Sequence, residues 1–316
     1  MTIPKNLTLG VIFAIVTGAL WGLVFVAPKT VTAFSPLMLV AGRYLVYGLL
    51  ALGLVLFRLR QILPLLTAKN LAIAFGLAII GNTLYYLLLT NAILLAGVPI
   101  ATLIIGLMPV TIALVGCLQK GAVPFMRLAP ALTLGTAAIA LITLDAFGTG
   151  LSLGTAGPII GMVLAMGALL SWTGFAVGNS FFLERHADLS SEDWNLIIGL
   201  VTGLQGLALM PVALNHAPLP TDTSLWLNFL FVCVAIAFFA SLVANALWNR
   251  VSRLLPLTLV GPMVLFETLF ALLYGFAWEQ RLPQFLEIAA MLLMLASVLL
   301  SIRAHRTQPR LHTQPA

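Results

Sequence analysis

The chain has 316 residues, of which 61% are hydrophobic and only 8% are charged. Soluble domains carry about 25% charged residues, so this composition excludes a soluble globular protein and indicates a polytopic membrane protein. The formal net charge of +6 would suggest a nucleic-acid partner in a soluble protein. Here the Lys and Arg residues lie in short loops, where they report membrane topology instead.

Ten apolar stretches are each long enough to cross a bilayer as a helix, which takes about 20 residues. They run over residues 9–27, 36–57, 71–94, 97–119, 127–144, 158–182, 194–214, 225–248, 255–276 and 284–301. The third and fourth stretches nearly touch, so the sequence predicts a tight turn around Gly97 and Pro99.

The positive charges are distributed very unequally between the two sides of this layout. Twelve of the 15 Lys and Arg residues lie on the side of the N-terminus, two lie on the other side, and Arg43 lies inside a span. Because positively charged loops stay in the cytosol, both termini are predicted to be cytosolic, in a cell inner or plasma membrane.

A Gly-rich segment, residues 148–157, divides the ten spans into two sets of five. We predict two five-helix repeats, residues 1–147 and 158–302, followed by a basic, disordered cytosolic tail, residues 303–316. Because five is odd, the second set enters the membrane from the opposite side and the repeat is inverted. The predicted fold class is therefore an all-α integral membrane protein with ten transmembrane helices in two inverted repeats.

The fourth and ninth spans each carry a glycine and a proline shortly after a Thr-Leu step. The predicted helix breaks are at Pro109 in the fourth span and at Gly261 and Pro262 in the ninth. Spans interrupted in this way at corresponding positions of two halves point to the binding site of a transporter.

Polar and amphipathic side chains from five spans fall at a similar depth. At about 1.5 Å per residue, Arg43 and Glu267 lie about 10 and 13 Å from the outer ends of their spans. The other candidate site residues are Trp21, Tyr86 and Gln205 at a similar depth, and Asn82 in mid-span. The tryptophan can instead be a packing residue, and the asparagine can simply form a hydrogen bond between helices.

The two intramembrane charges allow several roles. Arg43 either pairs with Glu267 or binds a carboxylate or phosphate of the substrate. Glu267 either holds helices together, carries the coupling proton, or binds a substrate ammonium group. A carboxylate at such a depth costs roughly 2.5–3.5 kcal/mol, which favours a functional role.

The chain resembles the drug/metabolite transporter superfamily, specifically proteins built from two EamA-type halves of five helices. The resemblance is carried by Ala19-Leu20-Trp21-Gly22, Arg43, Pro109, and Gly261-Pro262 with Phe266-Glu267. It implies ten helices with cytosolic ends, helices five and ten at the periphery, and secondary transport, mostly export, of a small metabolite. The chain departs from the usual pattern in having Glu267 near a position where many relatives place a Pro-plus-aliphatic pair.

A layer with both charges suits a zwitterion, such as an amino acid or an amine-bearing metabolite. The alternatives are a nucleotide-sugar or lipid-linked carrier, which would need more basic residues in the layer, and a non-transporting membrane scaffold or sensor. No cluster with metal-ligand spacing and no Walker-type Gly-Lys motif occurs, so we expect no metal, no cofactor and no enzymatic activity. The expected partners are a small-molecule substrate, the lipid bilayer and protons as a coupling ion, with no nucleic acid, in a monomer or homodimer.

Overall fold

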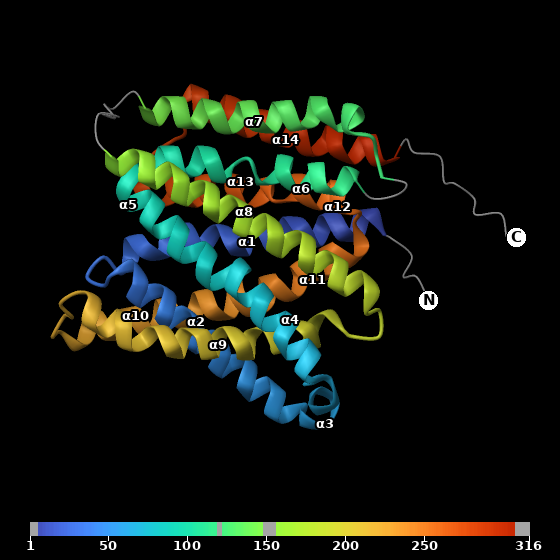
Figure 1. Cartoon of the computed structure of the whole chain (residues 1–316). Helices are drawn as coiled ribbons and strands as arrows, with labels where there is room; N and C mark the ends of the chain where they lie inside the picture. The colour runs from blue at the N-terminus through green and yellow to red at the C-terminus, as the bar shows by residue number, and fades with distance from the viewer. Residues whose placement is uncertain (1–5, 119–121, 148–155, 307–316) are drawn as a thin grey trace, which may run out of the picture.

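A computed structural model describes residues 6–118, 122–147 and 156–306, and within these ranges every regular element is a helix (Figure 1). The first half contains α1 (Leu7–Thr30), α2 (Pro36–Phe57), α3 (Leu59–Ile62), η1 (Leu63–Leu65), α4 (Ala68–Ala78), η2 (Ile79–Thr83), α5 (Leu84–Ile105), α6 (Met108–Cys117) and α7 (Phe125–Phe147). The second half contains α8 (Ala156–Arg185), α9 (Ser191–His216), α10 (Thr223–Ile236), η3 (Ala237–Val243), α11 (Ala244–Leu254), α12 (Leu257–Met263), α13 (Leu265–Glu279) and α14 (Phe285–Arg306). The segment η1 is a 3₁₀-helix, whereas η2 and η3 are π-helical.

Eight segments of the described chain are long and apolar enough to cross a membrane. They are Leu7–Val24, Pro36–Phe57, Ala68–Ala92, Gly157–Arg185, Ser191–Asn215, Thr223–Leu254, Leu257–Trp278 and Phe285–His305. Each corresponds to a predicted span, which confirms a multi-pass membrane protein. The fourth and fifth predicted spans correspond to the shorter apolar helices Met108–Cys117 and Phe125–Leu141, so a count of ten crossings stays a prediction.

Several helices begin where a polar side chain caps the first turn. The Ser35 hydroxyl accepts a hydrogen bond from the Met38 backbone N–H at 3.2 Å, and Pro36 follows it at the first helical position of α2. Asn6, Thr67, Ser190 and Asp222 cap α1, α4, α9 and α10 in the same way. These side chains satisfy backbone donors that a helix leaves free at its start.

The predicted turn around Gly97 and Pro99 is wrong. Helical structure continues through both residues, and the chain leaves the helix only at Gly106 and Leu107, inside the predicted fourth span. Pro109 follows this break, and because proline lacks a backbone N–H it cannot bond to the carbonyl four residues earlier. The helix is therefore interrupted next to Pro109, and not between the predicted third and fourth spans.

The two predicted non-helical segments are only partly described. Helix α8 begins at Ala156, so residues 156 and 157 of the predicted linker are helical, and residues 148–155 lie outside the described chain. Helix α14 continues to Arg306, so residues 303–306 of the predicted tail are helical, and residues 307–316 lie outside the described chain.

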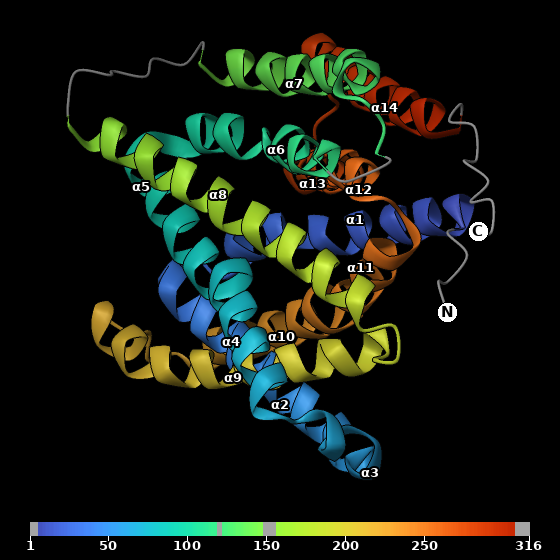
Figure 2. The ribbon, with the colours of Figure 1, turned by 45° about the vertical axis from the view of Figure 1, so that its right-hand side comes forward.

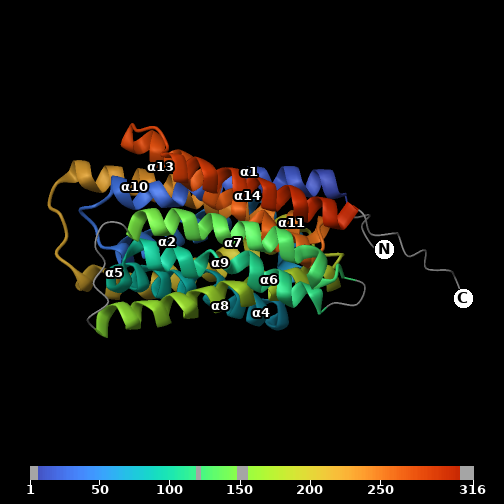
Figure 3. The same ribbon diagram turned by 90° about the horizontal axis from the view of Figure 1, so that it is seen from above.

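The helices pack in pairs that join distant parts of the sequence. Helix α7 packs along α14 at one edge of the bundle, and α2 packs along α9 on the opposite side (Figures 1 and 2). Between them, α5 packs along α8, and α1 packs against both α11 and α13. The start of α1 and the end of α14 lie at the same end of the bundle (Figure 3).

Helices α2 and α9 are in close backbone contact. A Cβ atom built on Gly203 would lie 2.4 Å from the Gly48 Cα, and one built on Gly48 would lie 2.3 Å from the Gly203 Cα. Only glycine at both positions permits this approach, which is how small residues bring helices together in a membrane.

We predict that Gly203→Ala destabilises the protein by about 1–3 kcal/mol, because the new methyl group must push α9 away from α2. The matched control is Gly53→Ala on α2, where an added Cβ meets no atom within 4 Å. Thermal unfolding in detergent should give a lower midpoint for Gly203→Ala and an unchanged or higher midpoint for Gly53→Ala. Equal midpoints would contradict the close contact.

Candidate functional site

Arg43 is buried in α2, and groups from two other elements surround its guanidinium. Its Nε donates a hydrogen bond to the Ser241 hydroxyl of η3 at 3.0 Å, and its Nη1 donates to the Tyr86 hydroxyl of α5. The guanidinium carbon also lies 5.0 Å from the centre of the Tyr86 ring and 5.5 Å from that of Tyr44, within range of a cation–π interaction. The structure therefore joins Arg43 and Tyr86, two of the predicted site residues.

A polar atom next to Arg43 is without a partner. Within the described chain, the buried hydroxyl of Tyr44 has no hydrogen-bond partner. Buried polar groups of folded proteins are nearly always hydrogen-bonded, so such atoms call for a water molecule or a ligand.

Glu267 lies in the first turn of α13, directly after the break that separates α12 from α13 at Val264. Its carboxylate is half-buried and makes no hydrogen bond to any described residue. The partial positive charge at a helix N-terminus attracts a carboxylate placed there. Glu267 is thus held at a helix start with both oxygens available.

Helix α1 fixes the position of this turn. A Cβ atom on Gly18 would lie 2.6 Å from the Phe266 Cβ and 2.9 Å from the Glu267 backbone nitrogen. The Gly18-x-x-x-Gly22 motif, which by itself carries little functional information, therefore brings α1 into backbone contact with α13 at the level of the carboxylate.

Arg43 and Glu267 are near each other without forming a direct ion pair. They interact electrostatically, but no nitrogen of Arg43 lies within 4.0 Å of a Glu267 oxygen. Tyr85 and Tyr86 lie in the neighbourhood of Glu267. The arrangement therefore presents two opposite charges in one neighbourhood of the bundle without a direct ion pair between them.

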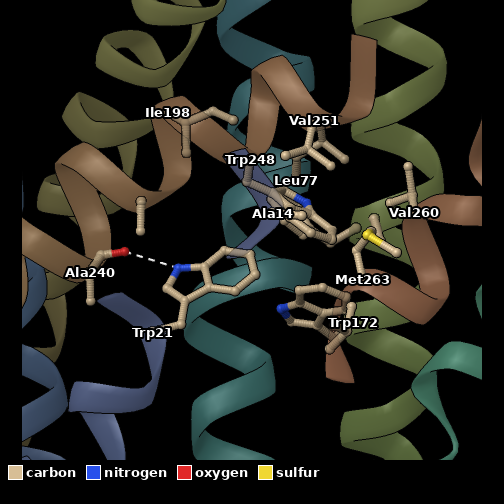
Figure 4. Packing of buried hydrophobic residues seen from close by; sticks show 14 of the residues in the cluster. Ala14, Trp21, Leu77, Trp172, Ile198, Ala240, Trp248, Val251, Val260 and Met263 are labelled. Carbon is tan, nitrogen blue, oxygen red and sulfur yellow. Dashed lines mark hydrogen bonds between the residues drawn. The ribbon is translucent and has the colours of Figure 1, made fainter. Parts of the chain in front are cut away.

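Trp21 belongs to an aromatic cluster (Figure 4). Its Nε1 donates to the Ala240 carbonyl at 3.0 Å and to Asn245 Oδ1 at 3.2 Å. Its ring centre lies 6.0 Å from that of Trp172 and 5.0 Å from that of Trp248. Trp21 is buried, and its only N–H group is already used, so its contacts are those of a packing residue.

Asn82 and Gln205 join α9 to the third span. Asn82 Nδ2 donates to the Thr202 hydroxyl at 3.0 Å, and the Thr83 hydroxyl donates to Gln205 Oε1 at 2.5 Å. Gln205 Nε2 also donates to the Phe75 carbonyl at 3.3 Å. Neither predicted site residue has a hydrogen bond to Arg43 or Glu267 among the described residues.

The π-helical segments η2 and η3 supply backbone carbonyls to these contacts. In η2, the Ile80 carbonyl accepts a hydrogen bond from the Ser171 hydroxyl at 2.6 Å. In η3, the Ala240 carbonyl accepts from Trp21, and the Leu242 carbonyl accepts from Asn195 Nδ2 at 2.8 Å. Single-turn π segments inside α-helices occur frequently at functional sites.

The predicted helix breaks meet at one crossing. A Cβ atom on Gly261 would lie 2.7 Å from the Pro109 carbonyl oxygen, so α12 crosses α6 in backbone contact. Both Pro109 and Pro262 are buried within the bundle and do not face lipid.

Sequence reasoning missed Ser241 and Tyr44 as neighbours of Arg43. Ser241 is the only hydroxyl in the interior of the eighth span, after 16 residues without one, and this was a usable signal. Tyr44 directly follows Arg43 and gave no signal, because adjacent helical residues normally point about 100° apart.

Comparisons with known proteins agree with this architecture. Residues 8–144 match the model of the EamA-like transporter family. The chain is 33% identical to "Inner membrane protein YtfF" of Escherichia coli (strain K12), over 95% of this chain and 97% of that protein. It is 29% identical to "Uncharacterized transporter YvbV" of Bacillus subtilis (strain 168), over 58% of this chain and 56% of that protein.

A solved structure titled "Crystal structure of protein" superposes with a TM-score of 0.74 at 19% identity, over 95% of this chain and 99% of that one, which shows a shared fold. Together, the matched family model and the nearly full-length relative show that this multi-pass membrane protein belongs to the EamA-like transporter family.

Proposed function

We propose that the chain is a secondary transporter that exports a small metabolite with an amino group and a carboxylate, such as an amino acid. The observation that carries this proposal is the pair of opposite charges in the interior of the bundle, which are near each other without forming an ion pair. Among the described residues, Arg43 and Glu267 make no direct ion pair with each other, and the Tyr44 hydroxyl beside Arg43 has no hydrogen-bond partner.

In this proposal, each end of the substrate binds to one of the two charges. The guanidinium of Arg43 and the Tyr44 hydroxyl, which has no hydrogen-bond partner among the described residues, would donate to a carboxylate. The oxygens of Glu267 offer acceptors to an ammonium group, and Tyr85 and Tyr86 lie nearby as aromatic neighbours. Only one arginine occupies the layer, so a nucleotide with several phosphates fits less well.

The helix pairing supports two inverted repeats of five spans. Exchanging the two halves replaces spans one, three and four by spans six, eight and nine, and the reverse. The contact α1–α11, between spans one and eight, then corresponds to the contact α8–α5, between spans six and three. The contact α1–α13, between spans one and nine, corresponds to α8–α6, between spans six and four, and all four contacts are present. The pairs α2–α9, α6–α12 and α7–α14 map onto themselves. The π segments η2 and η3 fall in the third and eighth spans, which correspond in the two halves. Broken helices at the repeat interface are typical of secondary-transporter sites.

Glu267 has a second role in the proposal, as the carrier of a coupling proton. A carboxyl group that alternately binds a proton and the substrate ammonium would couple export to proton entry. A half-buried carboxylate at a helix break would be accessible both to a proton and to the ammonium group of the substrate.

We predict that Glu267→Gln loses most transport while reaching the membrane in normal amount. Loss of a hydrogen bond to a charged group costs about 1.5–3 kcal/mol, or about ten- to hundredfold in affinity. The assay is efflux of labelled amino acids and small amines from membrane vesicles. If Glu267 binds substrate, pH-driven transport and exchange both fall; if it only carries protons, exchange persists.

The matched control is Asp222→Asn, the same carboxylate-to-amide change at an exposed helix cap that an amide can also supply. It should transport normally. A fully active Glu267→Gln variant would remove Glu267 from the mechanism.

We predict that Ser241→Ala weakens substrate affinity several-fold, because Arg43 loses the acceptor that orients its Nε. The effect should be larger for an amino acid than for the corresponding amine without a carboxylate. Ser241→Thr should restore affinity, since it keeps the hydroxyl. Equal effects on the two compounds would mean that Arg43 does not bind the carboxylate.

We predict that reporter fusions after Thr149 and after Ser301 report opposite sides, external and cytosolic respectively. The reason is that ten crossings with a 12-to-2 charge bias keep both termini in the cytosol. Fusions that report the same side would contradict the inverted arrangement without affecting the assignment of the charged site.

A further inference from the structure

A pocket lies between α2, α9 and α10, and none of the predicted site residues lines it. This pocket has a volume of about 340 Å³. Its lining residues are Met38, Gly42, Leu45, Val46, Met210, Thr223, Trp226, Leu227, Phe229, Leu230 and Cys233. The absent side chain at Gly42 helps to form the hollow, because a Cβ atom there would lie 2.9 Å from Phe229 Cζ and 3.0 Å from Cys233 Sγ.

The wall of this pocket is almost entirely apolar. The Thr223 hydroxyl is at one end, and the Trp226 N–H is already bonded to the Pro220 carbonyl at 2.9 Å. Sites for polar metabolites orient their ligands with a few convergent polar groups, which this pocket lacks. Its volume is at the low end of ligand pockets, about 300–1,000 Å³, so it fits one hydrocarbon chain better than a bulky ligand.

The pocket is within the part of the chain that the membrane surrounds. Its three helices belong to the candidate spans Pro36–Phe57, Ser191–Asn215 and Thr223–Leu254. At its rim, the side chains of Leu227 and Leu230 are 63% and 53% exposed. The medium that meets these residues is lipid.

We propose that this pocket binds one acyl chain of a bilayer phospholipid, in the leaflet where α2 and α10 begin. A second copy of the chain is a weaker candidate occupant, because helices that associate in membranes meet through small residues and this rim carries large ones. A hollow with apolar walls open to lipid is filled most readily by the surrounding chains themselves.

The bound acyl chain would also stabilise the helix next to the charged site. Gly42, which lines the pocket, directly precedes Arg43 in α2. An acyl chain packed between α2 and α10 would therefore stabilise the helix that carries the guanidinium.

Native mass spectrometry of protein purified in mild detergent tests this proposal with phospholipid as the probe. We expect wild type to retain one phospholipid that Met210→Trp does not retain, because the indole fills the pocket. The matched control is Val212→Trp, on the same helix, where the side chain is 57% exposed and lies outside the pocket. It should retain the lipid.

A second pair of variants tests the proposal even if Met210→Trp does not fold. Leu230→Trp changes an exposed rim residue, and Phe231→Trp changes its neighbour, which is 71% exposed and does not line the pocket. Only Leu230→Trp should reduce lipid retention, by about tenfold in relative affinity, or about 1.4 kcal/mol. The proposal would be overturned if each pocket variant retained as much lipid as its control variant. It would also be overturned if wild type formed a dimer that the pocket variants abolish, because the occupant would then be a second copy.

Discussion

A guanidinium inside a membrane is stable only where protein groups replace the water that it has lost. Arg43 meets this requirement through Ser241 and Tyr86, with the rings of Tyr86 and Tyr44 beside it. Because these partners come from α2, α5 and η3, the requirement forces three spans to meet at one point.

The π segments explain how apolar helices can supply polar contacts without many polar side chains. A π segment changes the hydrogen-bond pattern of its helix, so a backbone carbonyl can turn toward a neighbouring helix. The Ala240 carbonyl binds Trp21, the Leu242 carbonyl binds Asn195, and between them Ser241 binds Arg43. One short segment thus connects the eighth span to three others.

Glycine contacts set the depth and orientation of the acidic group. Gly18 brings α1 against the first turn of α13, and Gly261 brings α12 against Pro109 of α6. The break at Val264 lies between these two contacts in sequence, so Glu267 begins a new helix held from one side by α1. The glycine contacts therefore fix the backbone on which this carboxylate is carried.

The sequence alone determined the membrane class, the apolar spans and the two intramembrane charges, because span length and the cost of a buried charge are properties of the chain itself. It also placed Arg43 and Tyr86 at one depth. Only the tertiary structure decided that Ser241 and not Glu267 bonds to Arg43, and that Trp21 uses its N–H inside an aromatic cluster. The physical reason is rotational: one extra residue in a π segment turns everything after it by about 100°, and apolar sequence does not reveal where that residue is inserted.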